Sequence, residues 1–347
     1  MKKVLVSLVA IFMVTGIVGC GNSKTAPGEE NTQKAEETTK NVETESTENK
    51  EDGEYNIVFI PKGVGDFWSI VSGGFEQAAA DMGMECSVIY PSKEDAGIQT
   101  DTMYDVINSK PDAIVLSPVN ADPLVAPCQE AEKAGIPVVL VDTLIATEDY
   151  VNAFMTDNVA AGALAAEEMA KLMENEGKVH LFAGSAGSTA NVDRLKGFTD
   201  YMEANCPDIE IIGTLYSEVD VNLCTTQATD VMAANPDLKA VFAVDEMRTS
   251  GVGMALLQQG KAGDIIVGGF DANDDTVALM EQGVVNFLTI QQPYQMGYQA
   301  FNAALETVKG TIPEHEIVDT GCTIVRREEM DKEEMQKMLF PLKFIGE

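Results

Sequence analysis

The stretch that most constrains the fold is Asp264 to Asp271, which reads DIIVGGFD. An apolar, β-branched run of this kind is typical of a strand buried on both faces, as in a parallel sheet. The run stops on a carboxylate, and open α/β sheets bind ligands at the carboxyl ends of their strands. Val138 to Asp142 and Ala240 to Asp245 follow the same pattern. We therefore expect the three terminal aspartates to meet in one cleft.

From Tyr55 onward the chain alternates short apolar runs with amphipathic stretches. Repeated βα units predict parallel sheets with right-handed crossovers and helices on both faces. A first series of strands ends at Val141, and a second is expected to start with a strand over Val151 to Met155. After Pro313, one apolar run extends from Ile317 to Val325. A chain of 347 residues is long enough for two cores, so we predict an α/β fold with two similar doubly wound parallel-sheet domains.

The N-terminus differs from the rest of the chain. Lys2 and Lys3 precede the apolar run Val4 to Val18, which is short for a membrane-spanning helix and typical of an export signal. Ile17-Val18-Gly19-Cys20 resembles the lipobox of bacterial lipoproteins, which implies lipidation of Cys20 and a signal peptide over residues 1–20. The alternative is an ordinary secretory signal that contains a cysteine by chance.

Residues 21–54 contain almost no apolar side chains and many Glu, Thr, Asn and Lys. Such a segment buries too little surface to offset its chain entropy, so we expect a disordered acidic tether. Together with the lipid anchor, the tether predicts a folded body on the extracytoplasmic face of a bacterial cell membrane.

Charge and cysteine content exclude several classes of function. A formal net charge of -33 argues against nucleic acid, because a phosphate polyanion requires a basic face. The five cysteines after Cys20 have no C-x-x-C spacing, and no His/Cys/Asp cluster has metal spacing, so we expect no metal. Cys206 with Cys224 is a possible disulfide pair that the sequence leaves open.

Enzyme signatures are incomplete. Ala183 to Gly187 lacks the first glycine of G-x-S-x-G, and only His180, expected in a strand core, and His315, expected in a loop, could serve as a base. Gly251-Val252-Gly253 lacks the rest of a dinucleotide fingerprint. The sequence therefore favours a binding protein without a cofactor over an enzyme.

A set of polar and aromatic residues follows the expected strands and is suited to a polyhydroxylated ligand. Carboxylates and an amide can bind hydroxyls, an arginine donates in a fixed fork, and aromatic faces cover the C–H face of a sugar ring. The candidates are Phe67, Trp68, Asp142, Arg194, Asp245, Asp271 and Gln291.

Each candidate also has a structural explanation. Phe67 and Trp68 could belong to the core at the start of a helix. The aspartates could cap turns or helices, as we expect for Asp157-Asn158. Arg194 could pair with an acid on its own helix, such as Asp193 or Glu203.

Several short motifs occur in a fixed order along the chain. They are Asp66-Phe67-Trp68, Gly135-Ile136-Pro137-Val138 running to Asp142, Thr156-Asp157-Asn158, Arg194-Leu195-Lys196-Gly197-Phe198, Ala240-Val241-Phe242-Ala243 with Asp245-Glu246-Met247, Val267-Gly268-Gly269-Phe270-Asp271, and Gln291-Gln292-Pro293-Tyr294-Gln295-Met296-Gly297. In their order and spacing, these motifs resemble the periplasmic-type sugar-binding proteins of the ribose/galactose-binding class, which are type I solute-binding lipoproteins of ABC importers. The resemblance covers nearly all of Tyr55 to Val325.

The resemblance implies a role for each candidate. Phe67 and Trp68 would stack on the sugar, Arg194 and Asp271 would clamp its hydroxyls, and the polar ring would be completed by Asp142, Asp245 and Gln291. The family's two lobes are joined by three crossings, which would fall near Asp157, Gln291 and Asp319. The N-terminal lobe would then comprise residues 55–156 and 292–319, and the C-terminal lobe residues 157–291 and 320–347.

Three positions depart from the ribose binders. Thr143 stands where an arginine is typical, Gly65 where many have a ligand-binding asparagine, and Asp245 where asparagine is usual. The sequence therefore does not identify one sugar.

Two roles remain open. A monomeric binding protein could deliver a sugar to an ABC transporter permease in the membrane. It could instead present a sugar or a sugar-like signal, such as an autoinducer furanose, to a membrane receptor. A non-sugar ligand, such as a cationic solute attracted by the acids, is a further alternative.

Overall fold

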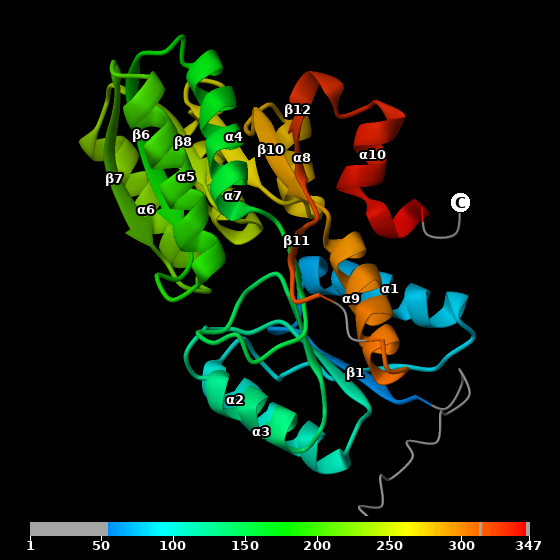
Figure 1. The fold of residues 1–347 in the computed structure, drawn as a ribbon. Helices are drawn as coiled ribbons and strands as arrows, with labels where there is room; N and C mark the ends of the chain where they lie inside the picture. The colour runs from blue at the N-terminus through cyan, green and yellow to red at the C-terminus, as the bar shows by residue number, and fades with distance from the viewer. Residues whose placement is uncertain (1–54, 312–313, 345–347) are drawn as a thin grey trace, which may run out of the picture. The chain divides into compact units, whose positions relative to one another are not determined.

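The computed structural model describes residues 55–311 and 314–344. Cys20 and the expected tether over residues 21–54 lie outside the described residues, so the predictions for them remain predictions. Within the described part, two six-stranded sheets form the framework, as the sequence predicts (Figure 1).

The first sheet has the strand order β11-β5-β4-β3-β1-β2, and all of its strands run parallel. Its strands are β1 (Ile57–Ile60), β2 (Ser87–Val88), β3 (Ala113–Leu116), β4 (Val138–Val141), β5 (Ala153–Met155) and β11 (Ile317–Asp319).

The second sheet repeats this plan with the order β12-β10-β9-β8-β6-β7. Its strands are β6 (Gly177–Ala183), β7 (Ile209–Tyr216), β8 (Leu238–Ala243), β9 (Ile266–Phe270), β10 (Phe287–Gln291) and β12 (Cys322–Arg326). The two sheets differ at one edge, because β12 pairs with β10 in the antiparallel direction whereas β11 is parallel to β5.

Helices cover both sheets and define two lobes. The first lobe contains the first sheet with α1 (Asp66–Asp81), α2 (Ala96–Ser109), α3 (Val125–Lys133) and α9 (Pro293–Val308). The second lobe contains the second sheet with α4 (Asn158–Leu172), α5 (Thr189–Asn205), α6 (Val221–Ala234), α7 (Glu246–Gln259), α8 (Asp274–Glu281), α10 (Glu333–Leu339), and the short 3₁₀ helices η1 (Arg327–Glu329) and η2 (Pro341–Phe344). The domain limits expected from the sequence remain a prediction.

Burial on both faces explains the unbroken apolar runs of the central strands. Every residue of β1, β3 and β4 is buried. Their side chains alternate between two apolar clusters, one around Phe59 and Phe75 and the other around Ile60 and Ile114. The second sheet likewise separates a cluster around Val241 and Leu288 from one that contains Phe242.

Short polar side chains fix where several helices begin. Asp95, Asp157, Asp220 and Asp245 each accept a hydrogen bond from a backbone N–H of the first turn of the following helix. Such caps satisfy amide groups that have no partner within the helix. The caps of α4 and α7 lie within two residues of the end of a strand. The turns between strand and helix are therefore short, and their residues stay at the carboxyl ends of the strands.

Three chain crossings connect the lobes. They lie between β5 and α4, between β10 and α9, and between β11 and β12. The Asp319 carboxylate accepts the backbone N–H groups of Asp157 at 2.9 Å and of Gly321 at 2.8 Å, so it ties two crossings together.

The crossings correct two expectations. The strand expected to open the second series is β5 (Ala153–Met155), and it belongs to the first sheet beside β4. The single run expected from Ile317 to Val325 is broken at Thr320-Gly321, so its two parts join different sheets. Apolar periodicity is the same on both sides of such a break and does not reveal it.

In each lobe, two helices pack through a pair of glycines. A Cβ at Gly74 of α1 would overlap the Tyr294 carbonyl of α9, and one at Gly297 of α9 would overlap the Val71 carbonyl of α1. In the second lobe, Gly162 of α4 and Gly197 of α5 approach the partner helix in the same way. Figure 1 shows α1 beside α9 and α4 beside α5.

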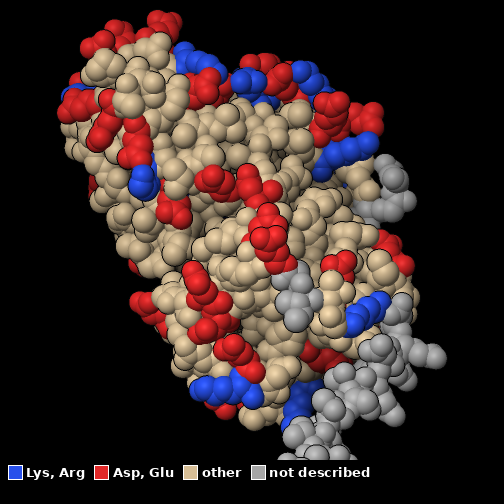
Figure 2. Space-filling model, viewed as in Figure 1, with Lys and Arg blue, Asp and Glu red and all other residues tan. Residues whose placement is uncertain are grey.

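Helix length, cysteine state and surface charge can be stated for the described residues. None of their helices is long and apolar enough to span a membrane. Cys206 and Cys224, the possible disulfide pair, are both free thiols. Acidic side chains are spread over the face shown in Figure 2, with basic side chains interspersed.

Candidate ligand-binding site

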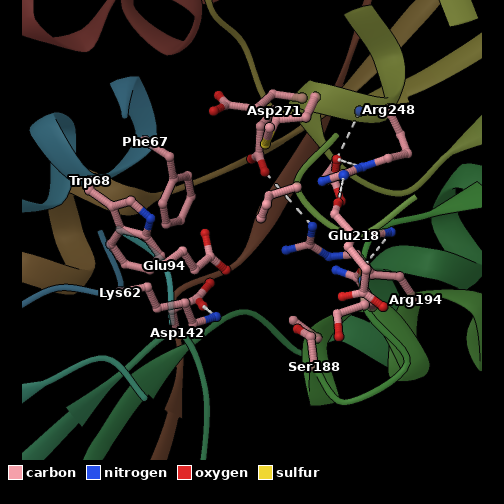
Figure 3. Close-up of a pocket in the computed structure, with 18 of the residues that line it drawn as sticks. Lys62, Phe67, Trp68, Glu94, Asp142, Ser188, Arg194, Glu218, Arg248 and Asp271 are labelled. Carbon is pink, nitrogen blue, oxygen red and sulfur yellow. Dashed lines mark hydrogen bonds and ion pairs between the residues drawn. The ribbon is translucent and has the colours of Figure 1, made fainter. Parts of the chain in front are cut away.

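One pocket contains all seven residues that the sequence singles out. Phe67, Trp68 and Asp142 come from the first lobe, and the second lobe contributes Arg194, Asp245, Asp271 and Gln291. The pocket holds about 700 Å³ of space, open solvent included. Figure 3 shows the labelled side chains facing one another across it.

Asp142 directly follows β4 and is a polar residue on the first lobe's side of the pocket. The backbone of Asp142 has a φ of 67°, a left-handed conformation that aspartate tolerates better than most residues. The carboxylate accepts hydrogen bonds from Lys62 Nζ at 2.7 Å and from the Thr143 hydroxyl at 2.8 Å. Burial acts to raise the pKa of Asp142, but the Lys62 ammonium, the Arg194 charge and the Thr143 hydroxyl together hold that pKa below its ordinary value.

Asp271 follows β9 and faces Arg194 and Gln291. The Gln291 amide nitrogen lies 3.0 Å from both carboxylate oxygens, whereas the nearest Arg194 nitrogen lies 3.8 Å away. Burial raises the pKa of Asp271 to about 6, against the opposing effects of the Arg194 charge and the Gln291 hydrogen bond. Asp271 is therefore a buried carboxyl whose ion pair with Arg194 is long, at 3.8 Å.

Arg194 is held by groups outside its own helix. Its Nε donates to Asn158 Oδ1 at 2.8 Å, and one terminal nitrogen donates to the Val244 carbonyl at 2.7 Å. The guanidinium also lies 3.8 Å from the centre of the Phe270 ring. These contacts hold the guanidinium in place without a ligand, so the alternative in which Arg194 pairs with Asp193 or Glu203 is wrong.

Asp245 both caps a helix and lines the pocket. One carboxylate oxygen accepts the backbone N–H of Arg248 at 3.0 Å and the Arg248 Nε at 2.6 Å. The capping and binding interpretations of this residue are therefore compatible. Asp271, by contrast, caps nothing, because Asn273 caps α8 with a reciprocal bond to Thr276.

The aromatic pair lies in the first turn of α1. The rings of Phe67 and Trp68 meet edge to face with centroids 4.9 Å apart, and Lys62 Nζ lies 5.5 Å from the centre of the Trp68 ring. Both residues are buried against the first lobe's core and also line the pocket. The core interpretation is therefore confirmed, and stacking on a ligand stays a prediction.

Sequence reasoning missed several lining residues. Lys62 is the clearest case, a buried lysine two residues after β1 that bonds both Asp142 and Thr143. Its signal was a lysine directly after a buried strand. The expectation that Asp157-Asn158 serves only as a cap holds for Asp157, whereas Asn158 positions Arg194. Other lining residues outside the predicted set are Glu94, Ser185, Asn191, Glu218, Glu246 and Arg248.

Neither histidine lines this pocket. His180 is buried in β6, where burial lowers its pKa, and His315 contacts the backbone carbonyls of Tyr150 and Val151. In the described part of the chain, no group of three or more His, Cys, Asp or Glu side chains could hold a metal ion. The pocket is thus lined by hydrogen-bonding groups and aromatic rings without an adjacent imidazole base.

Two α/β lobes, three connecting crossings and a polar pocket with aromatic residues between the lobes define a ligand-binding protein of the periplasmic type. Comparison with known proteins agrees with this class. The family described as periplasmic binding protein domain matches residues 57–312, and the chain belongs to that family.

Relatives of known name support the same assignment. The ribose import binding protein RbsB of Bacillus subtilis is 27% identical over 70% of this chain and 78% of its own length. The D-allose-binding periplasmic protein of Escherichia coli is 27% identical over 73% of this chain and 86% of its own length.

Solved structures show the same arrangement. An ABC transporter solute-binding protein from Agrobacterium vitis with bound D-fucose is 34% identical, with a TM-score of 0.77 over 82% of this chain and 99% of that one. A second one from the same species, bound to α-D-tagatopyranose, is 28% identical with a TM-score of 0.79 and the same coverage.

Proposed function

We propose that this protein is an extracytoplasmic solute-binding protein, which captures a small sugar in the pocket between its lobes and delivers it to the permease of an ABC importer. The observation that carries the proposal is the convergence of the seven residues from both lobes on one pocket. The names and bound sugars of the relatives support the ligand class.

The chemistry of the pocket suits a sugar. Phe67 and Trp68 offer ring surface for the apolar face, while Asp142, Asp245 and Asp271 accept from hydroxyls and Arg194 donates to them. Closing the lobes around the ligand would exclude water and strengthen these polar contacts. A function in binding rather than catalysis fits a pocket without a histidine.

Thermal unfolding with a panel of pentoses, hexoses and polyols tests the proposal. A ligand at 100 times its Kd adds about 2.7 kcal/mol to the free energy of unfolding. We expect at least one sugar to raise the Tm, with calorimetry confirming a single site. If no member of the panel changes the Tm, the proposed ligand class is wrong.

We further propose that Cys20 is lipidated and anchors a monomeric binding protein to the membrane. The lipobox-like sequence and the polar residues that follow it support this proposal. The Cys20→Ala variant should partition into the aqueous phase of a detergent extraction, whereas the parent enters the detergent. Equal partitioning of the two would contradict the anchor.

A further inference from the structure

The pocket contains twice as many acidic as basic side chains. Six acids line it, namely Glu94, Asp142, Glu218, Asp245, Glu246 and Asp271, and three bases, namely Lys62, Arg194 and Arg248. Lys62 pairs with Asp142 at 2.7 Å and Arg248 with Asp245 at 2.6 Å. Arg194 approaches Asp271 only to 3.8 Å. The bases are therefore already engaged, and carboxylates remain without a close cation.

Glu246 is the most unusual of these acids. It is the first residue of α7, and its Oε2 atom is buried without a hydrogen-bond donor. Burial raises the pKa of Glu246 to about 8, and the neighbouring carboxylates of Asp271, Asp245 and Asp66 act in the same direction. Arg248 opposes them but is held by Asp245 and by the Glu218 carbonyl.

Gln291 supplies a second unsatisfied acceptor in the same pocket. The residue is only 2% exposed, and its amide nitrogen is committed to both oxygens of Asp271. Its Oε1 atom is buried and receives no hydrogen bond. A buried acceptor without a donor is unfavourable, so a ligand that donates to it removes that penalty.

We propose that the ligand of this pocket carries a protonated amino group, as in an amino sugar or an amino polyol, and that Glu246 together with Asp271 receives that group. This inference rests on the proposed sugar-binding function and specifies its substrate class.

An ammonium fits these acceptors better than a hydroxyl does. It has three donor hydrogens and no acceptor, whereas a hydroxyl has a single donor hydrogen. Its positive charge also compensates buried carboxylates, and a hydrogen bond between charged groups is stronger than a neutral one. Lys62 and Arg194 remain as donors to the ring hydroxyls.

The test compares amino sugars with their neutral parents. The Kd of the full chain is measured by calorimetry for D-glucosamine and D-galactosamine, for D-glucose and D-galactose, and for the N-acetyl derivatives, which keep the nitrogen but not the charge. We expect an amino sugar to bind roughly 10- to 100-fold more tightly than its neutral parent and its N-acetyl derivative.

The Glu246→Gln variant tests the receiving group. It should remove most of the preference for the amino sugar over its neutral parent, read as the ratio of the two Kd values measured on the same variant. Glu203→Gln, an exposed glutamate of α5 away from the pocket, is the matched control and should change neither affinity. An unchanged amino-sugar preference in Glu246→Gln would overturn the role of Glu246.

Proton release provides a second readout. At about pH 6.5 the Glu246 carboxyl holds its proton in the free protein, and an arriving ammonium displaces it. Binding enthalpies measured in two buffers of different ionisation enthalpy should show a released proton for the amino sugar in the parent but not in Glu246→Gln. Equal release in both proteins would contradict the inference.

The outcomes separate the inference from the proposed function. If neutral sugars bind as tightly as their amino derivatives, the inference fails and the proposed function stands. If neither the amino sugars nor the pentoses, hexoses and polyols bind, both fail.

Discussion

Asp142 and Asp271 occupy corresponding places in the two lobes. Asp142 follows β4 and Asp271 follows β9, and each of these strands is the third across its sheet, counted from β11 or β12. Both residues have a φ near 60°, at 67° and 59°, and both line the same pocket. Their pKa values nevertheless shift in opposite directions. Asp142 has a lysine at 2.7 Å, whereas the arginine beside Asp271 stands at 3.8 Å and is held by other acceptors. The same backbone position thus gives a satisfied ion pair in one lobe and an under-compensated carboxyl in the other.

This difference indicates a division of tasks. The first lobe offers aromatic surface and a polar floor whose charges are already paired. The second lobe holds most of the carboxylates and the fixed Arg194 fork. The following variants test the comparison, from the largest expected effect to the smallest.

Lys62→Met should have the largest effect, and it should be on stability. Removing the ammonium leaves the buried Asp142 carboxylate with only the Thr143 hydroxyl as a hydrogen-bond donor, which typically costs about 3 to 5 kcal/mol. Urea unfolding measures this loss. The double variant Lys62→Met with Asp142→Asn should recover part of it, because no unpaired charge remains and asparagine tolerates the left-handed backbone of this position. A single variant as stable as the parent would show that the pair is not structural.

Arg194→Ala should reduce sugar affinity by about 2 to 5 kcal/mol, since it removes a preorganised donor in the second lobe's wall. Calorimetry with the best sugar of the panel measures the change. Arg326→Ala removes an arginine that pairs with Glu168 away from the pocket, and it should leave affinity unchanged. If the two variants behave alike, Arg194 does not contact the ligand.

The opposite pKa shifts predict opposite pH dependences. Because the folded state holds the Asp271 proton up to about pH 6, ionisation of this group lowers the free energy of unfolding as the pH rises from about 4 to about 6. Asp271→Asn should therefore gain about 1 to 3 kcal/mol relative to the parent above that window. Asp142 contributes stability that is present at neutral pH and lost in acid, so Asp142→Asn should lose stability at neutral pH.

Urea unfolding of both variants at about pH 4 and about pH 7 checks the two signs. Loss of stability by both variants at neutral pH would remove the contrast between the lobes.

Trp68→Ala should have the smallest effect, about 1 to 2 kcal/mol in sugar affinity, since it removes stacking surface but no polar partner. The loss should be similar for different sugars, because a ring face does not distinguish hydroxyl configurations. Tyr104→Ala on the exposed surface of α2 is the control. A change in sugar preference rather than a uniform loss would assign specificity to the first lobe as well.

The sequence predicted the architecture because its signals are local. A buried strand that ends on a carboxylate is visible in eight residues, as in Asp264 to Asp271. The sequence alone could therefore place Asp142, Asp245 and Asp271 at the carboxyl ends of strands, and hence in one cleft. Periodicity alone does not show which sheet a strand joins. For that reason it groups the strand over Val151 to Met155 with the second series and makes Ile317 to Val325 a single run.

The missed site residues depend on partners distant in sequence. Lys62 and Asp142 are separated by 80 positions, and the place of Lys62 after a buried strand does not show which group it pairs with. Asn158 is the first residue of α4 and has no distinctive sequence context. Only the hydrogen bond that it accepts from Arg194, 36 positions later, shows that it positions the guanidinium. Glu246 lies in the Asp245-Glu246-Met247 motif, but its unsatisfied oxygen depends on packing that only the structure describes.

The glycine pairs have a mechanical consequence. α9 begins at one crossing and is pressed against α1, which carries Phe67 and Trp68; α4 begins at another and is pressed against α5, which carries Arg194. Backbone touches backbone at these contacts, so no compressible layer of side chains separates the hinge from the groups that grip the ligand. Each lobe should therefore rotate as a rigid body about the crossings. A single methyl group added at Gly74 or Gly162 would separate the packed helices and weaken ligand binding, although neither glycine lines the pocket.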